Sequence, residues 1–268
     1  MRIALTIAGS DSGGGAGIQA DLKTFHQFGV FGTTVVTAIT AQNTRGVTDV
    51  HTIPPAVIES QFRALAEDLP PDACKTGMLG TAELVETVAS ALRRHGFGNY
   101  VLDPVMVATS GDRLLDADAE RSVADLLVPL ATIVTPNLDE ASILAAESVD
   151  SVERMERAGR DLLRRGARAA LVKGGHLKGD EIVDLLVTAE GVRRYGRTRV
   201  ETTSTHGTGC TLSSAIAAGL ALGRGLERAV ADALDFVHWA IATAPGLGAG
   251  HGPLNHFAAP PTEPGDVT

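Results

Sequence analysis

The sequence predicts an α/β fold built on a mostly parallel sheet. Short apolar runs rich in β-branched residues alternate with helical patterns almost from end to end. Strands that are apolar throughout, separated by helices of ordinary length, are typical of a parallel sheet with helices on both faces. The expected strands are Ile3–Ala8, Thr33–Thr40, Ala73–Met78, Tyr100–Asp103, Thr132–Thr135 and Ala169–Lys173.

Two amphipathic helices are expected between these strands. The first repeats apolar residues over Ile58–Leu69 and follows Pro54-Pro55, and proline suits the first turn of a helix. The second repeats apolar residues over Leu84–Leu92 and has Thr81 as a candidate N-cap.

The pattern changes after the sixth strand. Glu181–Thr188 and Gly191–Val200 are expected to form two antiparallel strands. Two helices rich in small residues follow at about Thr208–Leu222 and Leu226–Thr243. Val47–Ile53 is expected as a short extra strand that lies outside the main sheet.

A single domain is expected over residues 1–257, because no Pro/Ser-rich linker and no internal repeat divides the chain. A chain of 268 residues is close to the size at which single cores stop growing. Residues 258–268 contain prolines without any periodicity, so we expect a flexible C-terminal tail there.

The composition excludes several classes of protein. Apolar residues make up 44% of the chain and charged residues 21%, which are globular values and exclude wholesale disorder. The formal charge of −9 and the aromatic content of 4% argue against nucleic-acid binding, which needs basic and stacking surfaces. No apolar run reaches the ~18 residues of a membrane span, and the opening apolar run ends at Gly9, too early for a signal sequence. Two cysteines provide no disulfide framework, so we expect a cytoplasmic protein.

A glycine-rich segment joins the first strand to the first helix. Gly9–Gly17 would let a ligand approach the backbone closely and would present free N–H groups at the helix start. The spacing of Gly15, Gly17 and Ala20 also fits a loose dinucleotide fingerprint. However, the second strand ends near Gln42 without the acidic residue that binds ribose. A nicotinamide-dependent oxidoreductase and a purely conformational turn stay open as alternatives.

Asp21 lies on or beside the apolar face of the following helix, between Ile18 and Phe25. A buried carboxylate is costly unless it is paired or binds a ligand. Both an ion pair within the fold and a ligand role are therefore open for Asp21.

The segment with the most chemical content is Thr205–Thr211. Gly207, Thr208 and Gly209 open a helix of small residues, and the unpaired N–H groups of its first turn form an anion-binding site. The chain has no G-x-x-x-x-G-K-[ST] motif, so this segment is not a P-loop. Cys210 lies in the first turn, where the helix field lowers the pKa of a thiol and makes it a usable base. A cysteine that only fills a tight helix–sheet contact is the alternative.

Three other strand ends carry polar groups, and ligands of open α/β sheets bind at such ends. Asp103 precedes a polar loop over 106–112 that could close over a site. Asn137 and Glu140, three residues apart at a helix start, suit a hydrated Mg²⁺ ion, although Asn137 could simply be an N-cap. Lys173 precedes two glycines and supplies a cation for a polyphosphate. An anion site, carboxylates, a lysine and a base are together what phosphoryl transfer requires.

These segments also carry a family resemblance, in uninterrupted order over residues 3 to 257. The chain is similar to the hydroxymethylpyrimidine/phosphomethylpyrimidine kinases of thiamine biosynthesis, within the ribokinase-like superfamily. Ribokinase-like kinases usually have Gly-x-Gly-Asp, with the aspartate as base, where this chain has Cys210. The resemblance implies a three-layer α/β/α fold with a mostly parallel sheet and a small β flap, and a homodimer. The segments that carry it are AGSDSGGGAGIQADLKT, TAQNTRGV, KTGML, DPVMVATSGD, TPNLDEA, KGGH and THGTGCT.

The resemblance assigns roles position by position. Gln42 matches the glutamine that pairs with the pyrimidine amine, and Cys210 matches the residue thought to deprotonate the hydroxymethyl group. The other matched residues are Asp21, Met78, Val105 and Gly9 in the substrate pocket, Gly207, Thr208 and Gly209 in the anion hole, Glu140 and Asp103 near Mg²⁺, and Lys173, Asn137 and His206 on the nucleotide side.

The sequence therefore predicts an ATP- and Mg²⁺-dependent kinase that phosphorylates 4-amino-5-hydroxymethyl-2-methylpyrimidine and then its monophosphate. Its expected partners are small molecules and a second copy of the chain, not nucleic acid or membrane. Pyridoxal or pyridoxine phosphorylation on the same scaffold is the nearest alternative. Some relatives that phosphorylate pyridoxal use a second cysteine in the lid; residues 107–110 offer none and Cys74 lies in a strand, which favours the pyrimidine. A non-catalytic nucleotide-binding regulator is a further alternative.

Overall fold

The computed structural model describes residues 1–106, 115–175, 177 and 179–258. Most of the expected closing loop over 106–112 and nearly all of the expected tail lie outside these residues, as does His176 of the KGGH segment. Among the described residues, none of the helices combines the length and the apolar character needed to cross a lipid bilayer.

The strands of the described residues form one nine-stranded sheet. They are β1 (Ile3–Asp11), β2 (Phe31–Asn43), β3 (Gly46–Thr52), β4 (Ala73–Thr76), β5 (Tyr100–Leu102), β6 (Ile133–Val134), β7 (Ala169–Val172), β8 (Glu181–Thr188) and β9 (Gly191–Thr198). Their order is β3-β2-β1-β4-β5-β6-β7-β8-β9. Neighbours from β2 to β7 run parallel, whereas β3 at one edge and β8 and β9 at the other are antiparallel. The predicted mostly parallel sheet and the predicted antiparallel pair are confirmed.

The predicted strand at Val47–Ile53 is present as β3, but its predicted place outside the main sheet is wrong. β3 pairs antiparallel with the second half of β2, from Ala38 opposite Thr52 to Asn43 opposite Gly46. Without β3, the outer side of β2 would present unpaired N–H and C=O groups along the sheet edge. The chain returns at once and pairs with them, so β3 becomes the edge strand.

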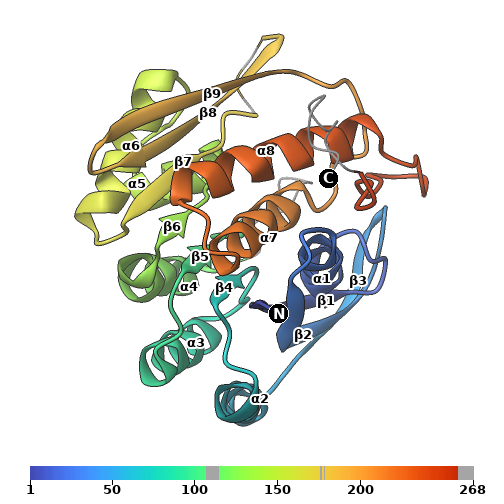
Figure 1. Ribbon diagram of the computed structural model, residues 1–268, viewed down its shortest axis with the longest axis vertical. Coiled ribbons are helices and arrows are strands. Elements are labelled where there is room, and N and C mark those ends of the chain that lie inside the picture. Colours follow the sequence, from blue (N-terminus) through green and yellow to red (C-terminus); the bar gives the residue numbers. More distant parts are fainter. Residues whose placement is uncertain (107–114, 176, 178, 259–268) are drawn as a thin grey trace.

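Helices cover both faces of the sheet (Figure 1). They are α1 (Gly17–Gln27), α2 (Pro55–Asp68), α3 (Ala82–His95), α4 (Ala117–Ser122), α5 (Leu138–Ala145), α6 (Val152–Arg164), α7 (Thr208–Ala221) and α8 (Leu226–Ala242), with short π and 3-10 turns at Val123–Leu127 and Val128–Leu130. Successive strand residues point to opposite faces. Thus Ala4 lies in the core with residues of α1, α7 and α8, and Leu5 lies in the core with residues of α2 and α3. The predicted three layers are confirmed.

The helix caps follow the sequence. The Thr81 side chain accepts a hydrogen bond from the Leu84 N–H at the start of α3, as predicted, and Gly96 ends that helix with φ +65°. Pro54 and Pro55 begin α2. These local signals fix where each helix meets the sheet.

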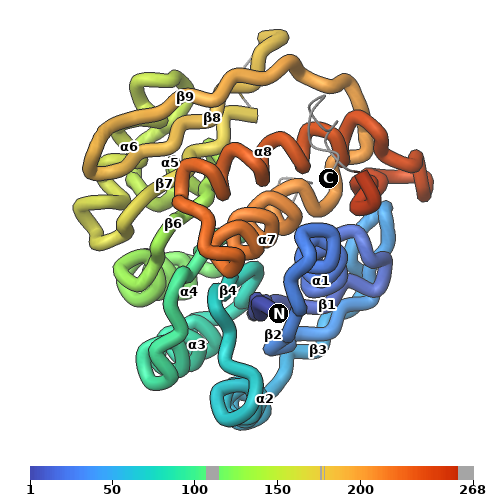
Figure 2. The backbone as a smooth tube through the Cα atoms, viewed as in Figure 1, coloured from blue at the N-terminus to red at the C-terminus, as the bar shows by residue number. Residues whose placement is uncertain are grey.

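α7 occupies the centre of its layer, beside α1 and beneath α8 (Figure 2). Every residue from Thr211 to Ala221 is buried, and most of them are Ala, Gly, Ser or Thr, which lets the helix pack closely between the sheet and a second helix. A Cβ on Gly219, for example, would lie 2.8 Å from the Ala229 Cβ of α8. This close packing places the first turn of α7 at the carboxyl edge of the parallel strands.

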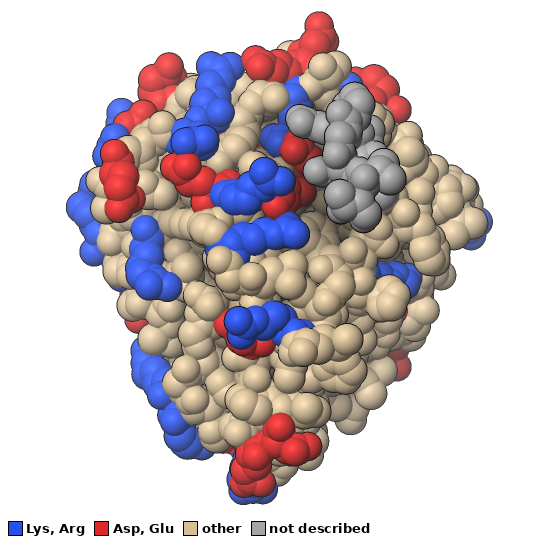
Figure 3. All heavy atoms as spheres, in the orientation of Figure 1, with Lys and Arg blue, Asp and Glu red and all other residues tan. Residues whose placement is uncertain are grey.

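Charges on the face viewed in Figure 3 are mixed, with basic side chains next to acidic ones. Arg197 pairs with Asp235 at 2.7 Å and Arg193 pairs with Glu227 at 2.8 Å. Such interspersed charge gives this face no extended basic surface.

Candidate active site

Two glycine-rich turns meet at the carboxyl edge of the sheet. One leads from β1 into α1, and the other ends at Gly207, the N-cap of α7, with φ +83°. A Cβ on Gly207 would collide with the carbonyl oxygen of Gly15, so the close approach requires glycine. Likewise, Gly17 has φ +56°, and its Cβ would collide with the carbonyl oxygen of Gly9. The first turns of α1 and α7 are thereby brought together.

Asp11 fixes the shape of the first turn. Its carboxylate accepts hydrogen bonds from the N–H groups of Gly13 (2.8 Å), Gly15 (3.0 Å) and Ala16 (2.8 Å), and it lies 3.0 Å from His206 Nε2. Burial opposes ionisation, but the hydrogen bonds from His206 and from the Ala16 and Gly13 backbone outweigh it and hold the pKa of Asp11 below its ordinary value. The N–H groups that a dinucleotide pyrophosphate would need are therefore already bonded within the protein, which contradicts the nicotinamide alternative.

Gln42 and His206 lie together at the end of β2. Gln42 Nε2 is 3.2 Å from His206 Nε2, and Gln42 Oε1 accepts a hydrogen bond from Thr40 Oγ1 at 3.2 Å. The Gln42 side chain remains partly exposed, so its amide is available to a ligand. The structure places His206 with Gln42 and Asp11, whereas the sequence grouped it with the nucleotide-side residues.

Gly9 and Met78 also lie at this edge. A Cβ on Gly9 would be 3.8 Å from Met78 Cε, in ordinary van der Waals contact. Val105, just beyond the end of β5, is partly exposed like Met78. The structure thus keeps Gly9 and Met78 in contact, as the resemblance grouped them.

Asp21 has no exposed surface, so the ion pair is the alternative that the geometry supports. Its oxygens accept hydrogen bonds from Thr6 Oγ1 (2.6 Å) and Ser214 Oγ (2.6 Å), and Lys75 Nζ lies 3.2 and 3.3 Å away. The structure therefore places Asp21 beneath the site instead of in the lining of the pocket that the resemblance assigned to it.

On the other side of α7, two carboxylates surround one ammonium group. Lys173 Nζ lies 3.4 Å from Asp103 Oδ1 and 3.9 Å from Glu140 Oε2. Ser213 of α7 donates to Asp103 Oδ2 at 3.3 Å. A Cβ on Gly209 would be 3.4 Å from Asp103 Oδ2 and 3.5 Å from Lys173 Nζ, so the first turn of α7 touches this group directly. Burial alone would lower the pKa of Lys173, but Asp103 and Glu140 raise it, and the side chain stays charged.

Asn137 and Glu140 form a capping box at the start of α5. Asn137 Oδ1 accepts from the Glu140 N–H at 2.9 Å, and Glu140 Oε2 accepts from the Asn137 N–H at 2.8 Å. The N-cap interpretation of Asn137 is therefore confirmed. Burial, opposed by Lys173 and reinforced by Asp103, raises the pKa of Glu140 to about 7. A carboxyl group that is costly to ionise beside a second carboxylate is suited to bind a cation.

Cys210 lies where the two turns meet and is partly exposed. The expectation that the helix field lowers its pKa is wrong. Burial raises the pKa of the Cys210 thiol to about 11, and this cost exceeds the stabilisation from Lys75 and from the Gly17 N–H at the start of α1. In the free protein at neutral pH, Cys210 is a thiol.

Sequence reasoning missed three polar residues around the site. Lys75 and Asp11 lie in the KTGML and AGSDSGGGAGIQADLKT segments, and the available sequence signal was a lysine inside the predicted strand Ala73–Met78. Arg199, beyond β9, donates hydrogen bonds to three carbonyl oxygens of the loop that follows Lys173, and no sequence signal pointed to it. These oxygens belong to Gly175 (2.9 Å), Leu177 (2.7 Å) and Gly179 (3.0 Å).

A sequence model of the phosphomethylpyrimidine kinase family matches residues 11–255. The chain belongs to the phosphomethylpyrimidine kinase family. A hydroxymethylpyrimidine/phosphomethylpyrimidine kinase of Rhizobium meliloti is 52% identical over 258 residues, covering 95% of this chain and 97% of the relative.

Two solved structures extend the comparison. The phosphomethylpyrimidine kinase of Clostridium difficile 630 superposes with a TM-score of 0.81 at 42% identity, over 89% of this chain and 98% of that one. The pyridoxal kinase of Bacillus subtilis, solved as an ADP complex, gives a TM-score of 0.90 at 38% identity, over 96% and 97% of the two chains. The predicted ribokinase-like fold and the predicted kinase class are confirmed for this phosphomethylpyrimidine kinase family member.

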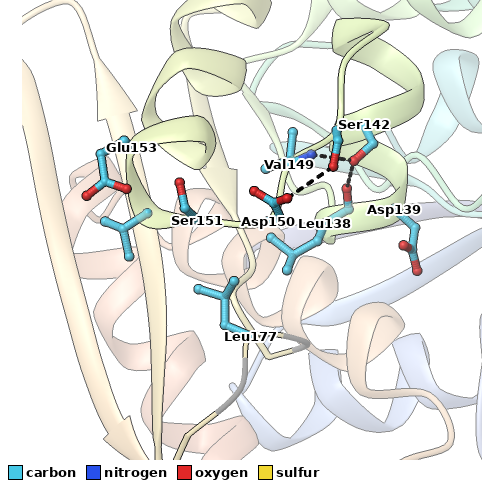
Figure 4. Close-up of a pocket in the computed structure, with 10 residues that line it drawn as sticks. Leu138, Asp139, Ser142, Val149, Asp150, Ser151, Glu153 and Leu177 are labelled. Carbon is cyan, nitrogen blue, oxygen red and sulfur yellow. Dashed lines mark hydrogen bonds between the residues drawn. The ribbon is translucent and has the colours of Figure 1, made fainter.

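A hollow of about 770 Å³ lies between the starts of α5 and α6 (Figure 4). Asp139, Asp150 and Glu153 line it, and the described lining residues include no lysine or arginine. Three carboxylates repel a polyphosphate, so the lining of this hollow does not favour a triphosphate.

Proposed function

We propose that this enzyme transfers the γ-phosphoryl group of ATP to the hydroxymethyl group of 4-amino-5-hydroxymethyl-2-methylpyrimidine and then to the resulting monophosphate. One observation carries the proposal. The first turn of α7 touches Gly15 on one side and the Asp103–Lys173 pair on the other. An acceptor held near Gln42 and a triphosphate held near Lys173 would therefore meet at the same N–H groups.

The acceptor ring is recognised by Gln42. A side-chain amide both donates and accepts hydrogen bonds, so it matches the amino group and adjacent ring nitrogen of an aminopyrimidine edge. Gly9, Met78 and Val105 supply small and apolar surface for the ring. A site that pairs polar groups in this way discriminates against analogues that leave them unpaired.

The transfer step uses the first turn of α7. The first turn of α7, with Gly207, Thr208 and Gly209, stabilises the charge on the moving phosphoryl group through the N–H groups that follow Thr208, because the Thr208 N–H itself bonds the Thr205 carbonyl at 3.3 Å. Lys173 stabilises the leaving ADP oxygen. The bond from the γ-phosphorus to the bridging oxygen breaks as the bond to the acceptor oxygen forms. The hydroxyl proton passes to Cys210 Sγ, which must be a thiolate in the reactive complex.

Asp103 and Glu140 fit a Mg²⁺ ion. Mg²⁺ is usually bound in proteins by one or two carboxylates, with water and substrate phosphate oxygens completing its shell. The described residues offer these two carboxylates beside Lys173. They include no group of three or more His, Cys, Asp and Glu side chains arranged to hold a metal ion. When bound, Mg²⁺ neutralises charge on the phosphate oxygens.

Residues 1–257 act as one cytoplasmic domain that forms a homodimer. Exposed apolar side chains on the β2–β3 edge support self-association, since Ile39, Val47 and Val50 are each about half exposed. Sedimentation of the wild-type enzyme and of V47K measures this directly, and a monomeric wild type would remove the dimer from the proposal.

The decisive experiment for the reaction is ³¹P NMR of the products formed from ATP and the hydroxymethylpyrimidine. A monophosphate signal that gives way to a diphosphate signal supports two transfers, whereas a persistent monophosphate supports one. If no product forms, the non-catalytic nucleotide-binding regulator is the interpretation that remains. The structural likeness to a pyridoxal kinase makes pyridoxal the second candidate substrate. A higher kcat/KM for pyridoxal than for the pyrimidine would overturn the assignment.

A further inference from the structure

A fully buried ion pair lies beneath the start of α7. Lys75 of β4 and Asp21 of α1 both have no exposed surface, and Lys75 Nζ is 3.2 and 3.3 Å from the two Asp21 oxygens. Thr6 of β1 and Ser214 of α7 each donate a hydrogen bond to Asp21 at 2.6 Å. The pair thus joins four elements that surround the candidate site.

Stability alone does not account for charges at these positions. Removing two ionised groups from water costs more than their mutual attraction commonly returns, and replacing a buried pair with apolar residues is often neutral or stabilising. Lys75 has no exposed surface, so an unbranched apolar side chain of similar length, such as methionine, is the apolar replacement closest to it in shape.

The pair lies next to Cys210. Ser214, which bonds Asp21, follows Cys210 by four residues on α7 and so lies on the same helix face. Gly17, the first residue of the helix that carries Asp21, directs its N–H toward the Cys210 sulfur. The Lys75 ammonium also faces the turn after β4, because a Cβ on Gly77 would lie 3.3 Å from Lys75 Nζ.

An ammonium group has three hydrogens to donate. Among the described residues, the hydrogen bonds of Lys75 Nζ go to Asp21 alone. Burial by itself would lower the pKa of Lys75, but Asp21, Cys210 and Asp103 raise it above its ordinary value. Lys75 is therefore a fixed positive charge with no exposed surface.

We propose that Lys75, held in place by Asp21, Thr6 and Ser214, is a positioning residue of the transfer step that stabilises the thiolate of Cys210. This inference rests on the proposed role of Cys210 as the base. A thiolate at this site is costly, and Lys75 is the cation that reduces the cost where the acceptor proton is taken.

The charged groups that act on Cys210 come from several elements. Lys75 favours the thiolate, Asp21 and Asp103 oppose it, and Lys173 also interacts with it. Lys75 acts on the thiol more strongly than Asp21 does. Removing the whole pair should therefore raise the thiol pKa, although less than removing Lys75 alone.

The test measures the thiol itself in the free enzyme and needs no turnover. In a C74A background, so that Cys210 is the only cysteine, the rate of alkylation by iodoacetamide at pH 8.5 reports the thiolate fraction. We expect K75M to slow this rate roughly tenfold, equivalent to about one pKa unit, and to move the acidic limb of the kcat profile to higher pH. T76V is the matched control, since it removes the buried hydrogen bond between Thr76 and Tyr100 on the next residue of β4. It should leave the alkylation rate unchanged.

Because K75M leaves Asp21 buried without a counter-ion, the double variant D21N/K75M is measured in parallel. It should also slow alkylation, by a smaller factor. An unchanged alkylation rate in a folded K75M or D21N/K75M enzyme overturns the inference. If alkylation slows in these variants but C210A has normal turnover, then Lys75 does stabilise the thiolate, and the proposed role of Cys210 as the base is wrong.

Discussion

His206 Nε2 lies 3.0 Å from Asp11 Oδ2, and this contact joins two glycine-rich turns whose residues are 195 positions apart in the sequence. Asp11 accepts hydrogen bonds from the N–H groups of its own turn, and the His206 nitrogen that faces Asp11 also lies 3.2 Å from Gln42 Nε2. The orientation of the residue proposed to read the pyrimidine is therefore coupled to the packing of α1 against α7.

This network predicts that His206→Ala weakens binding of the pyrimidine and not of ATP. Loss of a hydrogen bond to a charged group costs about 1.5–3 kcal/mol, so kcat/KM for the pyrimidine should fall roughly ten- to a hundredfold, mostly through KM. Steady-state kinetics with each substrate varied in turn measure the effect, with the exposed His251→Ala as control. A rise confined to the KM for ATP would restore the nucleotide-side role that the sequence suggested.

Gly207 and Gly223 offer a matched pair of substitutions at positive φ, +83° and +79°. A Cβ on Gly223 meets no atom within 4 Å, so G223A should cost only about 1 kcal/mol of left-handed strain. A Cβ on Gly207 collides with the Gly15 carbonyl, so G207A must also displace the first turn of α7. We expect G207A to unfold at lower denaturant than G223A and to lose activity, while G223A retains it. Equal stability and activity of the two variants would refute the proposed contact between the turns.

Cys210→Ala removes the proposed base. General base catalysis contributes roughly 10²–10⁴-fold, so kcat should fall by that factor while ATP binding, measured by calorimetry, is unchanged. Cys210→Asp should recover part of the rate, with the acidic limb of the kcat profile at lower pH, because a carboxyl ionises more readily than this thiol. The control is C74A, whose thiol is buried in β4 away from solvent. Normal turnover by C210A would remove Cys210 from the mechanism.

Glu140 gives a pH dependence of defined sign. Its pKa is about 7 in the folded protein against an ordinary value of 4.5, so the folded state binds the proton more tightly than the unfolded chain. The associated stability is present below pH ~4.5 and is lost as pH rises toward ~7. Relative to wild type, E140Q should therefore gain about 1–3 kcal/mol of stability between pH 5 and pH 8 in the absence of metal.

Thermal melts at both pH values, with and without Mg²⁺, measure this prediction. Mg²⁺ should raise the Tm of the wild type at pH 8, because it would bind the ionised Glu140 carboxylate and offset the cost of its burial. It should leave the Tm of E140Q unchanged. D139N removes an exposed carboxylate of the same helical turn and should behave as wild type. Equal Mg²⁺ stabilisation of E140Q would show that the ion binds elsewhere.

Local rules were enough to predict most of the fold. Apolar strands, the Thr81 cap and the buried small-residue helix α7 follow from patterns within single segments. The position of β3 could not be predicted from its own segment, because an edge strand joins a sheet only by pairing with another strand, here β2. The predicted lowering of the Cys210 thiol pKa was wrong for a related reason. Desolvation depends on atoms from distant segments, and here its effect on the pKa exceeds that of the local helix field.

The same distinction applies to the site. Glycine turns and strand-end residues are visible as motifs, and the structure brings Gly209, Asp103 and Lys173 together as expected. A residue that acts by bonding backbone carbonyls has no motif, because any loop provides acceptors. Arg199 is of this kind, and it could be found only from the folded chain.

Arg199 should control the affinity for ATP. Its guanidinium bonds the carbonyls of Gly175, Leu177 and Gly179, and this loop begins directly after Lys173. Three hydrogen bonds from one charged group hold Gly175, Leu177 and Gly179 in place, and without them these residues would have to be ordered when the nucleotide binds. We expect R199A to raise the KM for ATP roughly tenfold or more, with a small change in kcat. R199K cannot span three acceptors with a rigid planar group, so it should restore little.

The matched control is R194A, which removes a guanidinium from β9 that pairs with Glu181 at the surface. It should change neither kinetic constant, because exposed pairs of this kind contribute little. Hydrogen exchange on the loop separates the two variants without turnover: amides of residues 174–180 should exchange faster in R199A than in R194A. A slower kcat with an unchanged KM for ATP would mean instead that the loop acts on the transfer step and not on nucleotide binding.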